Sequence, residues 1–158
     1  KSITVPIEPT MRSYELLEKL SVIGVTALEN ALIAIESGVA PVPQTGQASI
    51  AAKITREEAA LDWNASSRAL HNKIRAFYPQ PQAWTNFRGQ PLKISSAKIA
   101  VTDIKLEPGE LKVVGNDCLI GTGDACLVLE KLTPAGKKEM SALDWSRGAS
   151  FESSERCG

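Results

Sequence analysis

Apolar residues recur at helical spacing over the first third of this chain. The first run follows a candidate N-cap at Ser13, and Gly24 interrupts it. A second run ends at Gly38, because glycine commonly follows the last turn of a helix. The apolar positions of the two runs are Leu16, Leu17, Leu20, Val25, Leu28, Leu32 and Ile35. We therefore predict two amphipathic helices, preceded by an extended segment over residues 3–6.

These two helices need other elements to cover their apolar stripes, and the residues next to them supply none. Residues 40–49 contain Pro41, Pro43 and Gly46 and few apolar side chains, which is typical of a linker. The chain also begins at Lys1 without a methionine. We expect residues 1–40 to be the end of a larger domain and residues 41–54 to be a linker.

A second region of structure is predicted to begin at Thr55. Thr55 and Glu58 have the spacing of a capping box, in which each residue satisfies an amide hydrogen of the other at a helix start. A further helix is expected over residues 64–77, where Leu70 and Ile74 share a face with Phe77. The segment Tyr78-Pro79-Gln80-Pro81 would end that helix, because proline cannot continue it.

From residue 83 onward the apolar pattern shifts towards a period of two, which predicts strands. Turn-forming residues separate the predicted strands, and short strands at this spacing favour a small antiparallel barrel. The expected strands cover residues 83–87, 92–101, 111–114, 118–122 and 125–132. A final helix should begin after the N-cap Ser141 and end at Gly148. The polar tail, residues 149–158, is expected to be disordered.

The charge balance is even overall but uneven along the chain. Of 158 residues, 18 are basic and 18 are acidic. Residues 53–94 hold seven basic and three acidic residues, whereas the segments on either side are acidic. A local excess of positive charge is compatible with a polyanionic partner, although most such segments are solvated surfaces.

Catalytic chemistry is not indicated by the residue types present. The single histidine, His71, falls in the middle of a predicted helix, with no nucleophile placed beside it. Gly121-Thr122-Gly123 lacks the lysine of a phosphate-binding loop, so a hairpin turn is the better interpretation. We expect no active site and no metal.

The cysteines and aromatic residues are interpreted as core positions. The three cysteines lack the C-x-x-C spacing of a zinc or redox site, and free buried thiols are typical of a reducing compartment. We expect a cytoplasmic protein, or one of an organelle matrix, with no membrane partner. The residues assigned to the core on this basis are Cys118, Cys126, Trp63, Phe77, Trp84 and Trp145.

Several separate segments, in the same order, resemble the methionyl-tRNA formyltransferase family. Residues 61–63, 71–85, 89–94 and 132–142 resemble its C-terminal domain. Residues 10–38 and the segment up to Ile54 resemble the end of its formyltransferase domain and the linker that follows. Gln80 and Gln82 depart from the more usual Pro-Trp-Pro-Gly loop of the family.

The resemblance implies two domains and a division of labour between them. Residues 1–40 would end a Rossmann-like catalytic domain, which uses 10-formyltetrahydrofolate as formyl donor. Residues 55–148 would be an OB-like barrel that binds initiator Met-tRNA. The catalytic Asn, His and Asp of the family have no counterpart in this chain, so we expect the chain alone to be inactive and to bind no folate.

The basic residues of the linker, the second helix and two turns are the candidate phosphate contacts. They are Lys53, Arg56, Arg68, Lys73, Arg75, Arg88, Lys93, Lys137 and Lys138. An alternative is that the barrel is a structural or assembly element of another 10-formyltetrahydrofolate-dependent formyltransferase, of the amino-sugar type. A continuous basic face would favour tRNA binding, and scattered charges would favour the alternative.

Overall fold

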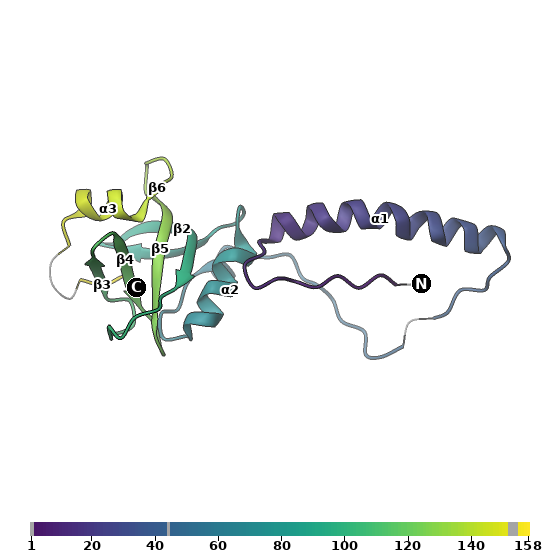
Figure 1. Cartoon of the computed structure of the whole chain (residues 1–158), viewed down its shortest axis with the longest axis horizontal. Helices are drawn as coiled ribbons and strands as arrows, with labels where there is room; N and C mark the ends of the chain where they lie inside the picture. The colour runs from purple at the N-terminus through teal and green to yellow at the C-terminus, as the bar shows by residue number, and fades with distance from the viewer. Residues whose placement is uncertain (1, 44, 152–154) are drawn as a thin grey trace. The chain divides into compact units, whose positions relative to one another are not determined.

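The chain divides into two compact units, residues 1–53 and 54–158. The structure is a computed structural model that describes residues 2–43, 45–151 and 155–158 (Figure 1). The class is mixed α and β, with helices in both units and all strands in the second.

The first unit contains one long helix, α1 (Ser13–Glu36), so the prediction of two helices is wrong. Glycine in a helix interior costs only about 1 kcal/mol relative to alanine, and Gly24 lies within an otherwise favourable run. At the start, the Glu15 carboxylate accepts the Arg12 N–H at 2.8 Å, which makes Arg12 the N-cap rather than Ser13. Gly38 follows the last turn with φ +70°, as predicted.

The second unit begins with the predicted capping box. The Thr55 N–H donates to Glu58 Oε2 at 2.7 Å, and the Glu58 N–H donates to Thr55 Oγ1 at 3.2 Å. This box opens only a short 3-10 helix, η1 (Glu57–Ala59).

Helix α2 (Ser67–Phe77) starts three residues later than expected. The delay arises because Asp62 forms a turn with the residues after it, accepting the N–H of Asn64 at 3.1 Å. Ser66 then caps α2 by accepting the Ala69 N–H at 3.3 Å. The helix packs on β2 (Figure 1).

The sheet has six antiparallel strands in the order β1-β2-β5-β4-β3, with β6 paired to β5. Five strands match the predicted ones to within two residues at each end, and β6 was not predicted. Their bounds are β1 (Ala83–Phe87), β2 (Gln90–Ile99), β3 (Leu111–Val114), β4 (Asp117–Gly121), β5 (Cys126–Pro134) and β6 (Met140–Ser141). Strand pairing alone leaves β1 and β3 as the edges of this path and does not close a barrel.

The end of the chain runs between those two edges, so the expectation of a disordered tail is wrong for residues 155–158. The Gly158 N–H donates to Asn86 O at 3.0 Å, on the β1 side, and the Leu111 N–H donates to Glu155 O at 2.9 Å, on the β3 side. Cys157 is only 5% exposed. Residues 152–154 of the predicted tail lie outside the described residues.

The hairpin between β4 and β5 fixes the start of α2. The Gly123 N–H donates to Ala65 O at 2.9 Å, and Asp124 Oδ1 accepts the Ser67 N–H at 2.7 Å. A Cβ on Gly123 would lie 2.1 Å from the Asn64 carbonyl oxygen. The Gly121-Thr122-Gly123 motif is therefore a hairpin turn, as predicted. Gly123 allows this turn to pack closely against the backbone that precedes α2.

The core of the second unit lies between the sheet, α2 and α3 (Ala142–Ala149). Trp63 is buried, and its indole Nε1 donates to Thr85 Oγ1 at 3.0 Å. The three cysteines are free and buried, and burial raises the pKa of the Cys118 thiol to about 12. No helix of the described residues is long and apolar enough to cross a membrane.

Candidate nucleic-acid interface

Trp84 is the centre of one group of candidate cations. Its neighbours Ala83 and Thr85 point into the core, so Trp84 faces outward and is half-buried. The strand register pairs Trp84 with Lys93 of β2. The guanidinium of Arg56 lies 5.1 Å from the centroid of the Trp84 ring, and the Trp84 indole Nε1 donates to the Arg56 carbonyl oxygen at 2.8 Å.

Lys73 reaches the same place from α2. Its Nζ donates to Ala60 O at 2.7 Å, and Ala60 forms a backbone bridge with Trp84. Arg56 thus lies over the half-exposed indole, Lys73 bonds to the residue that bridges Trp84, and Lys93 pairs with Trp84 in the strand register. We call these four residues the Trp84 cluster. A cation over an aromatic ring and further cations beside it are suited to a phosphate backbone.

Asp62 is an acidic side chain beside this cluster, close enough to Lys73 for the charge of the lysine to affect it. The pKa of Asp62 is lowered mainly by hydrogen bonds from the side chain and N–H of Asn64, and less by Lys73. Part of the positive charge of the cluster is therefore balanced locally.

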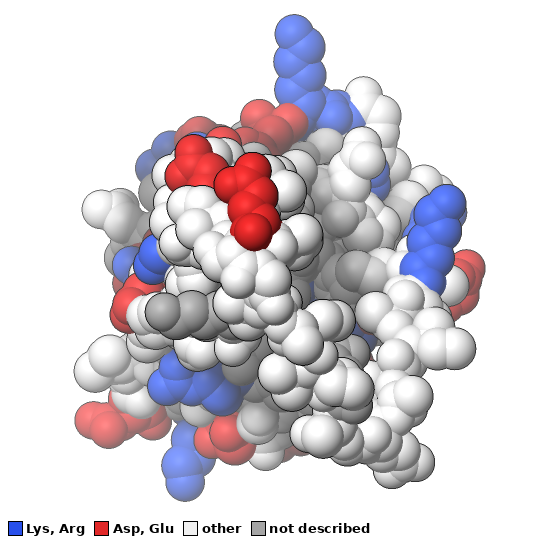
Figure 2. Space-filling view, turned by 90° about the vertical axis from the view of Figure 1, so that its right-hand side faces the viewer, with Lys and Arg blue, Asp and Glu red and all other residues white. Residues whose placement is uncertain are grey.

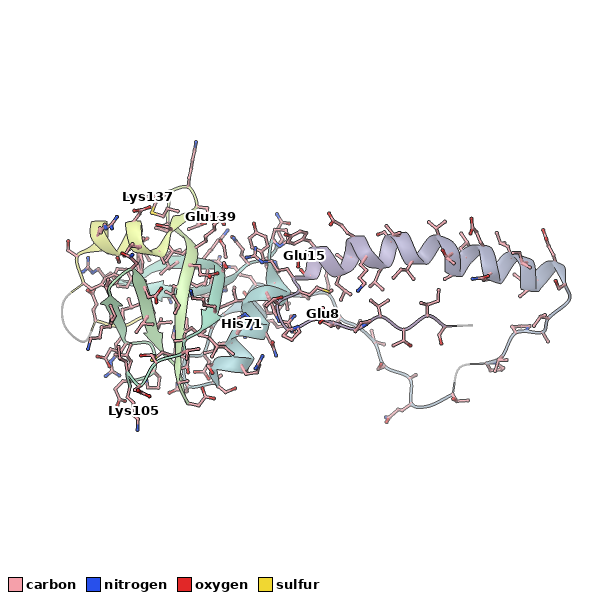
Figure 3. All side chains as sticks on the ribbon, viewed as in Figure 1. Glu8, Glu15, His71, Lys105, Lys137 and Glu139 are labelled. Atoms are coloured by element: carbon pink, nitrogen blue, oxygen red, sulfur yellow. The ribbon has the colours of Figure 1, made fainter. Side chains whose placement is uncertain are left out.

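Arg68 and Arg75 form a second group, near enough to His71 of α2 for their charges to affect it. Figure 3 shows the place of His71. The pKa of His71 is lowered first by burial and then by the charges of Arg75 and Arg68, while Glu130 opposes the shift. Among the described residues, His71 Nδ1 is a buried polar atom without a hydrogen-bond partner. The lowered pKa favours the neutral form of His71.

A third group lies around α3 and the turn between β5 and β6. Arg88 forms an ion pair with Glu155, in which Arg88 Nη2 donates to Glu155 Oε2 at 2.8 Å, and its guanidinium lies 5.0 Å from the Phe87 ring centroid. Lys137 and Lys138 are exposed on the turn, where the Lys137 N–H donates to Pro134 O at 3.1 Å (Figure 3). The charge of Arg88 is thus partly neutralised.

The contacts join eight of the nine candidates into three groups. Lys53, the ninth, is exposed at the end of the first unit. Figure 2 looks onto the unit that contains α1, and there Lys and Arg atoms lie in separate small patches among Asp, Glu and uncharged atoms. The Trp84 cluster combines a cation over an aromatic ring with two further cations at neighbouring positions of the backbone.

A family of known proteins matches most of the second unit. The family described as formyl transferase, C-terminal domain, matches residues 53–150. The chain belongs to this family.

Curated relatives of the family's enzymes extend the similarity over both units. A methionyl-tRNA formyltransferase of Paenarthrobacter aurescens (strain TC1) is 38% identical over 148 residues, which are 93% of this chain and 48% of the relative. That of Mycobacteroides abscessus is 40% identical over 152 residues, or 95% of this chain and 49% of the relative. The resemblance inferred from the motifs is confirmed, and the chain spans about half the length of these relatives.

Solved structures share the fold of this formyl transferase family member. HypX from Aquifex aeolicus, in one variant, aligns with TM-score 0.68 at 17% identity, covering 90% of this chain and 27% of that one. HypX in complex with tetrahydrofolic acid aligns with TM-score 0.63 at 18% identity, over 90% of this chain and 26% of that one. At these identities the likeness concerns the fold alone.

The sequence prediction placed Trp84 in the core, whereas the structure shows it half-buried and facing outward. The signal was available, because strict alternation from the buried Ala83 and Thr85 places Trp84 on the opposite face. Trp63 and Trp145 are buried, as predicted. Among the described residues, no group of three or more His, Cys, Asp or Glu side chains could hold a metal ion.

Proposed function

We propose that this chain is the tRNA-binding part of a methionyl-tRNA formyltransferase, which formylates initiator Met-tRNA with 10-formyltetrahydrofolate in translation initiation. The observation that carries the proposal is the 38% identity to such an enzyme over 93% of the chain, because it spans both units and the segment between them. The enzyme would act in the cytoplasm or in an organelle matrix.

The second unit would be an OB-like barrel. Its antiparallel sheet supports this assignment, as does the C-terminal segment that bonds to both β1 and β3. Barrels of this kind hold nucleic acid on one curved face and its loops. We assign the tRNA contacts to the nine candidate cations, with the Trp84 cluster as their centre.

Helix α1 would belong to a Rossmann-like catalytic domain. Its apolar side chains at Leu17, Leu28 and Ile35 are exposed, and further elements of that domain would cover them. The folate and the formyl transfer are assigned to that domain, since the catalytic Asn, His and Asp implied by the resemblance have no counterpart in this chain. This chain would hold the tRNA backbone and contribute little to the choice of the initiator.

Salt dependence of tRNA binding tests the proposal. Each neutralised phosphate should contribute a slope of about −0.7 to −0.9 to a plot of log affinity against log salt. Filter binding of initiator tRNA to the chain at several salt concentrations should give a steep negative slope. Affinity that does not change with salt would contradict phosphate binding.

The alternative is a structural or assembly role in another 10-formyltetrahydrofolate-dependent formyltransferase, of the amino-sugar type. One observation favours it, namely the pairing of Arg88 with Glu155, which partly neutralises one of the candidate cations. Under this alternative the chain would bind tRNA no better than it binds any polyanion. A competition between tRNA and heparin at equal charge concentration would separate the two functions.

A further inference from the structure

A cavity of about 270 Å³ lies between α3, the end of β1 and the turn that joins β5 to β6. Phe87, Pro134, Met140 and Trp145 give it an apolar and aromatic lining. The rings of Phe87 and Trp145 are held edge to face, with centroids 4.9 Å apart, so this lining is preformed. Such a volume is close to the lower end of the range of about 300–1,000 Å³ for small-molecule sites, which suits a single nucleotide.

Cations line the same cavity. Arg88 and Lys137 come from the two turns beside it, and both side chains are exposed. Arg88 is already paired with Glu155, whereas Lys137 lies on the open turn, whose glycine, Gly136, has φ +69° (Figure 3). Lys137 is therefore the cation best placed to contact an incoming phosphate.

Asp144 is the acidic side chain among the described residues of the lining, and its charge is compensated. Asp144 Oδ1 accepts from Arg147 at 3.2 Å, and Asp144 Oδ2 accepts from the Ser141 hydroxyl at 2.7 Å. Its charge is thus countered within α3, and it does not cancel the positive charge of Arg88 and Lys137.

We propose that this cavity binds one unpaired nucleotide of an RNA strand, with the base on the Phe87–Trp145 lining and the phosphate at Lys137. An aromatic floor with a cation beside it is the combination that single-stranded nucleic acid sites use. The inference rests on the proposed tRNA function and extends it, because backbone contacts alone require no cavity for a base.

Gly148 offers a way to fill the cavity without disturbing the core. It lines the cavity, and a Cβ built on it meets no atom within 4 Å. Gly148→Leu should occupy the space, and Gly148→Ala is the matched control, because both replace a helical glycine. Lys137→Ala removes the cation, with Lys105→Ala as its control, since Lys105 is exposed, lies outside the candidate set and does not line the cavity.

The experiment is a ¹⁵N NMR titration of the chain with a single-stranded RNA of six nucleotides. The chain has three tryptophans. The indole N–H of Trp63 donates to the Thr85 hydroxyl, and that of Trp84 donates to the Arg56 carbonyl oxygen. The Trp145 indole signal, assigned with Trp145→Phe, should move on addition of RNA. Gly148→Leu and Lys137→Ala should each weaken this binding about tenfold, and Gly148→Ala and Lys105→Ala should change it less than twofold.

Three outcomes would overturn the proposal. The first is a Trp145 indole signal that does not move when RNA is added. The second is the same shift with inorganic phosphate alone, and the third is the same shift with an acidic peptide of equal charge. Binding of initiator tRNA to the same variants separates this inference from the function on which it rests. If the unmodified chain does not bind tRNA, both the proposed function and the nucleotide site are contradicted. If tRNA binding depends on salt but Gly148→Leu leaves it unchanged, only the nucleotide site is contradicted.

Discussion

Helices α1 and α2 have similar apolar patterns but very different surroundings. Helix α1 has 24 residues, all described, and none of them is buried, whereas the 11 residues of α2 include three buried ones. Leu28 of α1 is 61% exposed, and Leu70 of α2 is 1% exposed. Periodicity therefore predicts that a helix has an apolar face, but it does not say whether the same chain covers that face.

The largest expected effect follows from this contrast. Leu70→Ala should lower the free energy of unfolding of the second unit by about 2–5 kcal/mol, because it leaves a cavity in the core. Leu28→Ala should change it by less than about 0.5 kcal/mol, because the leucine is exposed. Urea unfolding followed by tryptophan fluorescence reports on the second unit, which contains all three tryptophans. Equal costs for the two substitutions would contradict the contrast.

Two glycines sharpen the same comparison. Gly123→Ala should destabilise the second unit, because the new Cβ would lie 2.1 Å from Asn64 O and force the hairpin away from α2. Gly24→Ala should instead raise the helicity of α1, since it meets no atom within 4 Å and alanine is favoured there by about 1 kcal/mol. Thermal unfolding and far-ultraviolet circular dichroism would measure both. A harmless Gly123→Ala would mean that the hairpin does not dock on α2 as described.

A smaller effect is expected on the pH dependence of stability, and it comes from His71 of α2. Burial lowers the pKa of His71 below the ordinary histidine value of 6.5, so the unfolded chain binds the proton more readily than the folded one. The free energy of unfolding should therefore increase with pH up to the pKa of His71 in the unfolded chain, and it should decrease as the pH falls below that pKa. Urea unfolding of His71→Gln between pH 5 and 8 should show a weaker dependence than the unmodified chain. An unchanged profile would assign the effect to other groups.

The strands were predictable from sequence because two signals agree along them. Alternation marks each strand, and residues such as Gly115 and Gly89, both with positive φ, mark the turns between them. β6 has only two residues and shows no period. The C-terminal segment also shows no apolar period, because Cys157 is a single buried residue among polar neighbours. Its order could therefore not be predicted from the sequence pattern.

The candidate site was less predictable than the fold. The local excess of positive charge identified Arg56, Lys73 and Lys93, but it did not group them, because they come from different elements. Their grouping depends on the strand register and on the Ala60–Trp84 bridge, which pair residues far apart in sequence. The cavity beside α3 depends on such pairings too, since Phe87 and Trp145 meet only in the folded sheet.

The most direct test of the central claim compares two triple variants in tRNA binding. Arg56→Ala, Lys73→Ala and Lys93→Ala together remove the cations of the Trp84 cluster. Lys98→Ala, Lys105→Ala and Lys112→Ala remove the same charge from exposed lysines outside the candidate set. The first variant should reduce the magnitude of the log-log salt slope by about 2–3, at about 0.7–0.9 per lost contact, and the second should leave it nearly unchanged. Equal losses in the two variants would show that net charge, rather than the Trp84 cluster, holds the RNA.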